Sequence, residues 1–178
     1  MSNYKIIFTG PVGAGKTTAI SSLSDIPVIS TYENASDMTV HRKGTTTVAL
    51  DYGLMKLDGG ERIHLYGTPG QERFDFMWDI LTKGGIGLVL LLDNTRADPF
   101  QDMQFFLNSF DDFISKTTLA IGVTRMDLDD KYSMADYHSE LGKLGIKPPI
   151  FEVDARKEKD INQLVEALLF TLDPWLGE

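Results

Sequence analysis

The sequence predicts an α/β fold with a mostly parallel sheet. Strand-like runs alternate with helix-like segments, the run 86–92 (IGLVLLL) has no polar side chain, and a glycine-rich stretch joins the first strand to the first helix. A strand that is apolar on both faces is typical of the middle of a parallel sheet covered by helices. The length of 178 residues, 42% hydrophobic and 24% charged, suits one core, so we expect a single domain over 1–178.

The first half of the chain predicts these elements in order. An apolar, β-branched run at 4–9 ends at Gly10 and Pro11 and predicts a strand, and a helix follows at 17–23. Residues 24–43 lack a steady period and are rich in Ser, Thr, Asp and Asn, so we expect a surface loop there. Strand-like runs at 46–57 and 62–66 flank Asp-Gly-Gly and predict an antiparallel hairpin.

The second half continues the alternation. The pattern predicts a helix that begins near Gln71, strands at 86–92, 119–123 and 150–153, and helices at 100–114, 132–144 and 161–172. The expected architecture is therefore three layers: a six-stranded, mostly parallel sheet with one antiparallel edge strand, and helices on both faces.

Residues 10–17 (GPVGAGKT) match the pattern G-x-x-x-x-G-K-[ST] and lie between the first strand and the first helix. Glycines permit a turn whose backbone N–H groups surround an anion, and the helix N-terminus adds partial positive charge. We expect Lys16 to reach the β- and γ-phosphates of a nucleotide and Thr17 to bind Mg²⁺. A glycine-rich turn that only caps a helix is the alternative. The expected phosphate-binding residues are Gly13, Ala14, Gly15, Lys16, Thr17 and Thr18.

Further segments resemble, in order and spacing, those of the Ras-like small GTPases, which are P-loop NTPases built on a small G domain. Residues 47–52 (TVALDY) resemble the family segment T-I-G-V-D-F, whose Thr binds Mg²⁺, and this implies a metal ligand at Thr47, with Thr46 as the alternate. Residues 67–72 (GTPGQE) resemble D-T-A-G-Q-E. This resemblance implies that the Gly70 N–H meets the γ-phosphate and that Gln71 orients the attacking water. A plain strand start and a Gly-Pro turn are the alternatives.

Two segments correspond to the family's base-binding motifs. Residues 124–127 (TRMD) stand where the family carries N-K-x-D, and residues 154–156 (DAR) resemble S-A-K, whose Ala N–H contacts the guanine O6. The Asp127 carboxylate can accept hydrogen bonds from N1 and N2 of guanine, which adenine cannot supply, and the Arg125 stem can stack on the purine. An acidic surface loop that begins at Asp127 is the alternative. The base site implied comprises Thr124, Arg125, Asp127, Ala155 and Arg156.

Two positions depart from the family pattern. Gly67 replaces the Asp that supports Mg²⁺ through water, and Asp93 either substitutes for it or caps the turn at 94–99. Val12 stands beside the expected γ-phosphate position and either obstructs Gln71 or packs under the neighbouring loop. The segment 67–72 resembles most the bacterial branches related to gliding-motility GTPases and to the signal-recognition-particle receptor β-subunit. Members of these branches often work with roadblock-type proteins, which suggests such a partner.

The resemblance implies a GTP-binding switch that hydrolyses GTP to GDP slowly, at about 10⁻³ s⁻¹ or below, with Mg²⁺ as cofactor. It implies a catalytic set of Gln71, Lys16 and Gly70, and signalling to a protein partner through the loops near Thr47 and Gln71. Two other interpretations remain open. One is a scaffold stabilised by a guanine nucleotide without hydrolysis, and the other is an ATP-using P-loop enzyme.

The composition excludes several classes of partner. The net charge of −9 disfavours nucleic-acid binding through a basic surface. The chain has no cysteine and therefore no site for prenylation or S-acylation, and residue 2 is Ser, not the Gly needed for myristoylation. The apolar run at the N-terminus is shorter than a signal-peptide core. We therefore expect a cytoplasmic protein with no direct membrane anchor.

Overall fold

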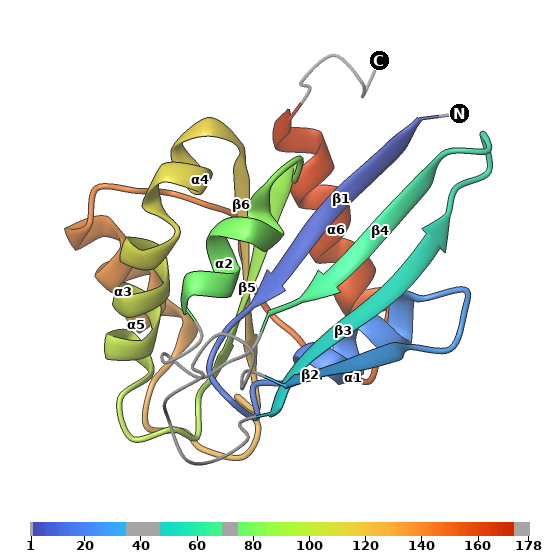
Figure 1. The fold of residues 1–178 in the computed structure, drawn as a ribbon. Coiled ribbons are helices and arrows are strands. Elements are labelled where there is room, and N and C mark those ends of the chain that lie inside the picture. The colour runs from blue at the N-terminus through green and yellow to red at the C-terminus, as the bar shows by residue number, and fades with distance from the viewer. Residues whose placement is uncertain (1, 35–46, 69–74, 173–178) are drawn as a thin grey trace, which may run out of the picture.

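A computed structural model describes residues 2–34, 47–68 and 75–172. These residues form a seven-stranded sheet in the order β2-β3-β4-β1-β5-β6-β7, with helices on both faces (Figure 1). The predicted α/β fold with a mostly parallel sheet is confirmed. The parallel strands are β1 (Asn3–Thr9), β4 (Arg62–Gly67), β5 (Gly87–Asp93), β6 (Thr118–Thr124) and β7 (Ile150–Glu152).

The prediction of six strands with an antiparallel edge strand is wrong. A seventh strand, β2 (Ile29–Asn34), lies within the segment expected to be a loop, and it pairs antiparallel with residues 47–52 of β3 (Thr47–Lys56). β3 is also antiparallel to β4, so the antiparallel strand lies inside the sheet, next to the edge. The sequence of β2 (ISTYEN) has no apolar face and therefore no strand-like pattern. Backbone hydrogen bonds to β3 are enough to hold an edge strand of this kind.

Six helices cover the sheet in the part of the chain that the structure describes. The long helix expected at 100–114 is two helices that meet at Phe110, whose backbone (φ −105°, ψ 15°) leaves the helical path. The Phe110 ring is buried and stacks on Trp78 with ring centroids 5.0 Å apart, so its packing explains the break. The helices are α1 (Lys16–Leu23), α2 (Asp75–Thr82), α3 (Pro99–Ser109), α4 (Asp111–Lys116), α5 (Met134–Lys143) and α6 (Glu158–Leu172).

Two apolar cores lie on the two faces of the sheet. One contains side chains of α1 and α6, such as Ile20 and Leu164, packed against β1 and β4. The other contains Trp78 of α2, Met103 of α3 and Tyr137 of α5. Both faces of β5 are therefore covered, which is why all seven of its residues are buried. No helix of the described residues is long and apolar enough to cross a membrane.

Candidate functional site

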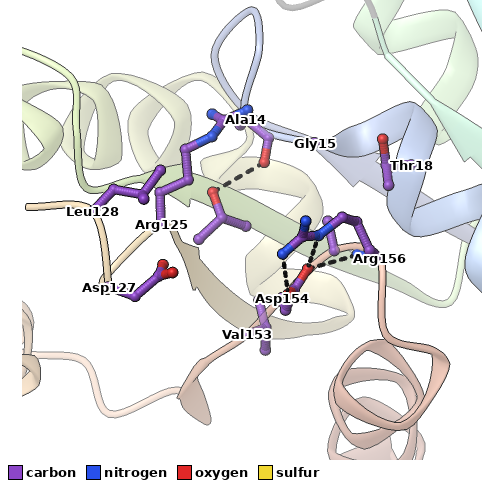
Figure 2. Close-up of a pocket in the computed structure, with 11 residues that line it drawn as sticks. Ala14, Gly15, Thr18, Arg125, Asp127, Leu128, Val153, Asp154 and Arg156 are labelled. Atoms are coloured by element: carbon purple, nitrogen blue, oxygen red, sulfur yellow. Dashed lines mark hydrogen bonds and ion pairs between the residues drawn. The ribbon is translucent and has the colours of Figure 1, made fainter.

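A pocket lies beyond the carboxyl ends of β1, β5 and β6, which end side by side because these strands are parallel. Such edges are the usual ligand sites of parallel α/β sheets. Figure 2 shows how three separate segments meet there. The pocket is lined by Ala14, Gly15 and Thr18 from the first loop and helix, by Thr124, Arg125, Asp127 and Leu128 after β6, and by residues 153–156 after β7.

The loop 10–17 has the backbone geometry that its glycines permit. Gly10, Gly13 and Gly15 have φ values of 145°, 82° and 101°, a range that L side chains rarely adopt. At Gly10 a Cβ would also overlap the carbonyl oxygen of Leu91 on the neighbouring strand. The loop therefore runs close against β5 and delivers Lys16 and Thr17 to the start of α1.

Lys16 is only 9% exposed, and its ammonium group lies inside the loop. The Nζ atom donates hydrogen bonds to the carbonyl oxygens of Gly10 (2.7 Å) and Pro11 (2.8 Å). Burial lowers the pKa of Lys16 to about 8, although the Asp51 charge acts in the opposite direction. The loop thus holds a buried cation that has no ion-pair partner within 4 Å among the described residues.

Thr124 and Arg125 join the strand β6 to the first loop. The Thr124 hydroxyl lies within hydrogen-bond distance of the carbonyl oxygens of Ala14 (3.1 Å) and Leu92 (3.0 Å). The Arg125 guanidinium donates to the Gly13 carbonyl and to the Asp93 carboxylate, both at 2.5 Å. Because both residues contact the first loop, the base segment and the phosphate segment form one connected site.

Asp93 caps the turn that follows β5. Its Oδ1 atom accepts hydrogen bonds from the backbone N–H of Thr95 (2.9 Å) and from the Thr95 hydroxyl (2.6 Å). The second carboxylate oxygen accepts from Arg125. Of the two interpretations of Asp93, the turn cap is therefore the one that the contacts bear out.

Asp127, Asp154 and Arg156 form the charged rim of the pocket. Arg156 donates to Asp154 from Nε (2.9 Å) and from a terminal nitrogen (2.8 Å), and these contacts lower the pKa of Asp154. Figure 2 shows the Asp127 carboxylate pointing across the pocket toward this pair. Among the described residues, none forms an ion pair with the Asp127 carboxylate within 4 Å. The pocket therefore presents the Asp127 carboxylate as an acceptor that faces the Asp154–Arg156 pair.

A second carboxylate, which the sequence interpretation missed, lies at the Thr17 end of the loop. Asp51 on β3 accepts a hydrogen bond from the Thr17 hydroxyl through Oδ2 and one from the Ser30 hydroxyl (2.8 Å) through Oδ1. Asp51 is the register partner of Gly67 on β4. A Cβ at Gly67 would lie 3.3 Å from the Asp51 Cβ and 3.5 Å from Asp51 Oδ2. The Asp51 carboxylate thus lies beside the place that a side chain at position 67 would take.

The structure brings together most of the residues expected to bind a nucleotide, and their roles remain predictions. Val12, 56% exposed, lies in the loop, and Thr47 is the first residue of β3. Gly70 and Gln71, expected to act in hydrolysis, lie outside the described residues, as does Thr46. The expected residues that line the pocket are Ala14, Gly15, Thr18, Thr124, Arg125, Asp127, Ala155 and Arg156.

The fold and the phosphate loop define a P-loop nucleotide-binding protein of the α/β class. A family model described as "Conserved hypothetical ATP binding protein" matches residues 27–173, and the chain belongs to this family. The match begins after the phosphate loop, so it rests on the rest of the fold, including the base segments.

The chain is also similar, over most of its length, to proteins named as Ras-related or GTP-binding. Ras-related protein Rab-8B of Bos taurus is 25% identical over 174 residues, 95% of this chain and 76% of that protein. GTP-binding protein YPT1 of Saccharomyces cerevisiae is 26% identical over 160 residues, 85% of this chain and 70% of that protein. These similarities support a place in the Ras-like GTPase superfamily.

An uncharacterised protein of Methanocaldococcus jannaschii is 34% identical over 98 residues. This match covers 55% of the chain and 56% of that protein. The chain therefore spans little more than half the length of this relative.

Proposed function

We propose that the protein is a guanine-nucleotide switch that binds GTP, hydrolyses it slowly to GDP and signals to a protein partner. The observation that carries the proposal is the position of the Asp127 carboxylate in the same pocket as the phosphate loop. The relative in Saccharomyces cerevisiae is named a GTP-binding protein, which agrees with this proposal.

The base preference follows from hydrogen-bond chemistry. A carboxylate is an acceptor only, and the edge of guanine formed by N1 and N2 offers donors, whereas the corresponding N1 of adenine is an acceptor. Asp127 therefore favours guanine and repels adenine. The Arg125 guanidinium is bound to Gly13 and Asp93, and its stem, which lines the pocket, is the proposed surface on which the purine stacks.

The phosphates would lie over the loop 10–17. Its N–H groups and the N-terminus of α1 favour anions, and Lys16 supplies a full positive charge. A nucleotide phosphate would replace the Gly10 and Pro11 carbonyls as the partner of the Lys16 ammonium. This exchange gives the buried cation a compensating charge, which explains why burying it is tolerated.

The oxygen-rich end of the loop fits Mg²⁺, which prefers carboxylate, hydroxyl and phosphate oxygens. Thr17 and Thr47 are the proposed ligands, and Asp51 would take the supporting role that the Asp at position 67 has in the resembling GTPases. Its contact with Thr17 and its place beside Gly67 support this assignment. When bound, the metal would neutralise the β- and γ-phosphate oxygens. Asp93 is already engaged by Arg125 and Thr95.

We expect slow hydrolysis because Gly70 and Gln71 supply catalytic groups, whereas Val12 obstructs them. We propose that Gln71 orients the attacking water and that the Gly70 N–H meets the γ-phosphate. Val12 is branched and 56% exposed, and we propose that it obstructs the approach of Gln71 to the γ-phosphate. The proposed contact region for a partner is the segments near Thr47 and Gln71. The proposed partner is a roadblock-type protein, the kind that works with the gliding-motility and receptor β-subunit branches that the chain resembles.

Binding of GTP, GDP, ATP and ADP, each measured by calorimetry with and without Mg²⁺, tests the proposal. We expect guanine nucleotides to bind at least about tenfold more tightly than adenine nucleotides, since each unpaired polar contact costs about 1–3 kcal/mol. Lys16→Ala should abolish binding, and Gln71→Ala should retain binding while lowering single-turnover hydrolysis. Binding of GTP to the Lys16→Ala variant with the parent's affinity would contradict the phosphate site.

The name of the matched family favours a second candidate, an ATP-binding protein. The same titrations separate the two, because an ATP-binding protein would prefer adenine nucleotides. Guanine preference without any single-turnover hydrolysis would instead favour a nucleotide-stabilised scaffold.

A further inference from the structure

Asn94 is a fully buried polar residue in the turn after β5 that the nucleotide site as described does not use. Its side-chain Nδ2 donates to the backbone carbonyl oxygens of Asp129 (2.8 Å) and Tyr132 (3.5 Å). Its Oδ1 accepts a hydrogen bond from the Tyr137 hydroxyl of α5 (2.7 Å). Both ends of the amide are therefore engaged, and the two carbonyls fix which end of the amide is which.

These contacts hold the loop that carries Asp127. Residues 125–132 run from the end of β6 toward α5, and at their start Arg125 is bound to Gly13 and Asp93. Asn94 binds the other end of the same loop, at Asp129 and Tyr132. Asp127 lies between these two anchored points, so its backbone position depends on both of them.

Thr124 does not reach the far end of this loop. Its hydroxyl is directed to the carbonyl of Ala14 in the phosphate loop and to that of Leu92 on β5. The backbone N–H of Asn94 donates to the Thr124 carbonyl (3.0 Å), which joins the turn after β5 to the end of β6. The far end is held from the surface by Lys131, which donates to the Arg96 and Ala97 carbonyls, and from the interior by the buried Asn94 amide, which binds the loop backbone directly.

Tyr137 sets the position of Asn94. Its side chain is fully buried, and its ring packs against Phe100 with centroids 4.9 Å apart. α5 begins at a capping box formed by Ser133 and Asp136, so the first turn of the helix, just before Tyr137, is well defined. A rigid helix thus delivers the hydroxyl that holds the Asn94 amide.

We infer that Asn94, held by Tyr137, is a positioning residue that sets base preference by fixing the loop on which Asp127 lies. The inference rests on the proposed function, because it assumes that Asp127 accepts hydrogen bonds from the base. Hydrogen-bond recognition depends on sub-ångström placement of the acceptor, so loss of the restraint lowers selectivity more than it lowers overall affinity.

The experiment compares the ratio of GDP affinity to IDP affinity between the parent and its variants. IDP differs from GDP only in lacking the 2-amino group, which is one of the donors to the Asp127 carboxylate. The full chain is used in three forms: the parent, Tyr137→Phe and Asn94→Ala. We expect the ratio to fall about threefold in Tyr137→Phe and about tenfold in Asn94→Ala, with IDP affinity changed less than twofold. Thr118→Val, which removes a buried hydroxyl at the start of β6, is the matched control and should keep the parent's ratio.

The same substitutions in an Asp127→Ala background separate positioning from general loss of stability. If Asn94 acts through Asp127, neither substitution changes the GDP to IDP ratio once the carboxylate is absent. Tyr137→Phe keeps the buried ring, so it tests the inference even if Asn94→Ala fails to fold.

The outcomes distinguish the inference from the proposed function. The inference alone is overturned if the GDP to IDP affinity ratio of Tyr137→Phe and of folded Asn94→Ala stays within twofold of the parent's ratio. It is also overturned if these substitutions change the ratio equally with and without the Asp127 carboxylate. A parent chain that binds GDP and IDP equally overturns the inference together with the guanine preference.

Discussion

At the scale of single residues, the polar contacts of the site join residues that are far apart in the sequence. Asp51 contacts Thr17 and lies beside Gly67, and Arg125 contacts both Gly13 and Asp93. Lys16 has backbone carbonyls as its hydrogen-bond partners. Because burial lowers the pKa of Lys16, its charge depends on pH and on an anionic ligand.

Lys16 predicts proton uptake when a nucleotide binds. Burial lowers its pKa from 10.5 to about 8, so much of it is neutral at about pH 8.5, and a bound phosphate would restore its charge. Calorimetry with GDP in buffers of different ionisation enthalpy should show uptake of about half a proton or more at pH 8.5 and little at pH 6.5. Lys5→Arg, a change at the start of β1, is the control; absence of uptake at pH 8.5 would contradict the assigned role.

The lowered pKa of Lys16 also determines how the stability of the nucleotide-free protein changes with pH. Because the folded pKa lies below the unfolded value, the unfolded chain binds more protons between about pH 8 and 10.5, and stability rises with pH across that window. Below pH 8 the buried charge costs up to about 3 kcal/mol. Urea unfolding midpoints at pH 7 and pH 9.5 should differ less in Lys16→Met than in the parent.

Asp51 predicts the metal dependence of GTP binding. Replacing it with Asn removes the negative charge beside the Thr17 hydroxyl and should reduce the gain in GTP affinity on adding Mg²⁺ by about tenfold or more. A Mg²⁺ titration of GTP binding measures this gain. Ser30→Ala is the matched control, since Ser30 contacts the other Asp51 oxygen. A Mg²⁺ dependence unchanged in Asp51→Asn would exclude the proposed supporting role.

At the scale of elements, close packing between α6 and the sheet requires small residues on the central strands. A Cβ at Gly87 of β5 would lie 2.5 Å from the Leu168 Cδ2 atom of α6 and 2.6 Å from the Thr118 hydroxyl oxygen. Gly122 of β6 is similarly close to Leu164 and Val153. These glycines let the helix approach the sheet closely.

Gly87→Ala should destabilise the fold by about 1–3 kcal/mol, because the added methyl group forces Leu168 or the helix to shift. The urea midpoint measures the effect. Gly59→Ala, in the turn between β3 and β4 where a Cβ meets nothing within 4 Å, is the matched control and should change stability by less than about 0.5 kcal/mol. Equal effects at both positions would contradict the packing argument.

At the scale of the whole molecule, the net charge of −9 and the phosphate loop act over different distances. Nucleotide phosphates would meet short-range donors, namely N–H groups, a helix N-terminus and Lys16, whereas an extended polyanion would meet the summed field of the chain. The overall acidity is therefore compatible with a phosphate ligand and unfavourable for a nucleic acid.

We expect no binding to a fluorescently labelled single strand of about 20 nucleotides at about 0.1 M salt, because the acidic chain offers few phosphate contacts. Fluorescence anisotropy at protein concentrations up to about 10 μM measures this. Binding that weakens steeply with added salt would show that a local basic surface outweighs the net charge.

The sequence by itself determined the phosphate loop, the parallel centre of the sheet and most helices. Gly10, Gly13 and Gly15 specify the loop because their backbone conformation excludes other residues, and residues 86–92 specify a buried strand through uninterrupted apolar character. The resemblance of segments 124–127 and 154–156 to the family's base-binding motifs implies that they share one site, and both segments line the same pocket.

Only the tertiary structure decided the strand β2, the partner of Thr17 and the anchor of the Asp127 loop. β2 is held by backbone bonds to β3, which leave no mark in side-chain periodicity. Asp51 lies beside Gly67 through the register of β3 and β4, and Asn94 meets Asp129 and Tyr137 through the order of β5, β6 and α5. Register and strand order are set by the packing of the whole chain, so contacts that depend on them cannot be deduced from local sequence.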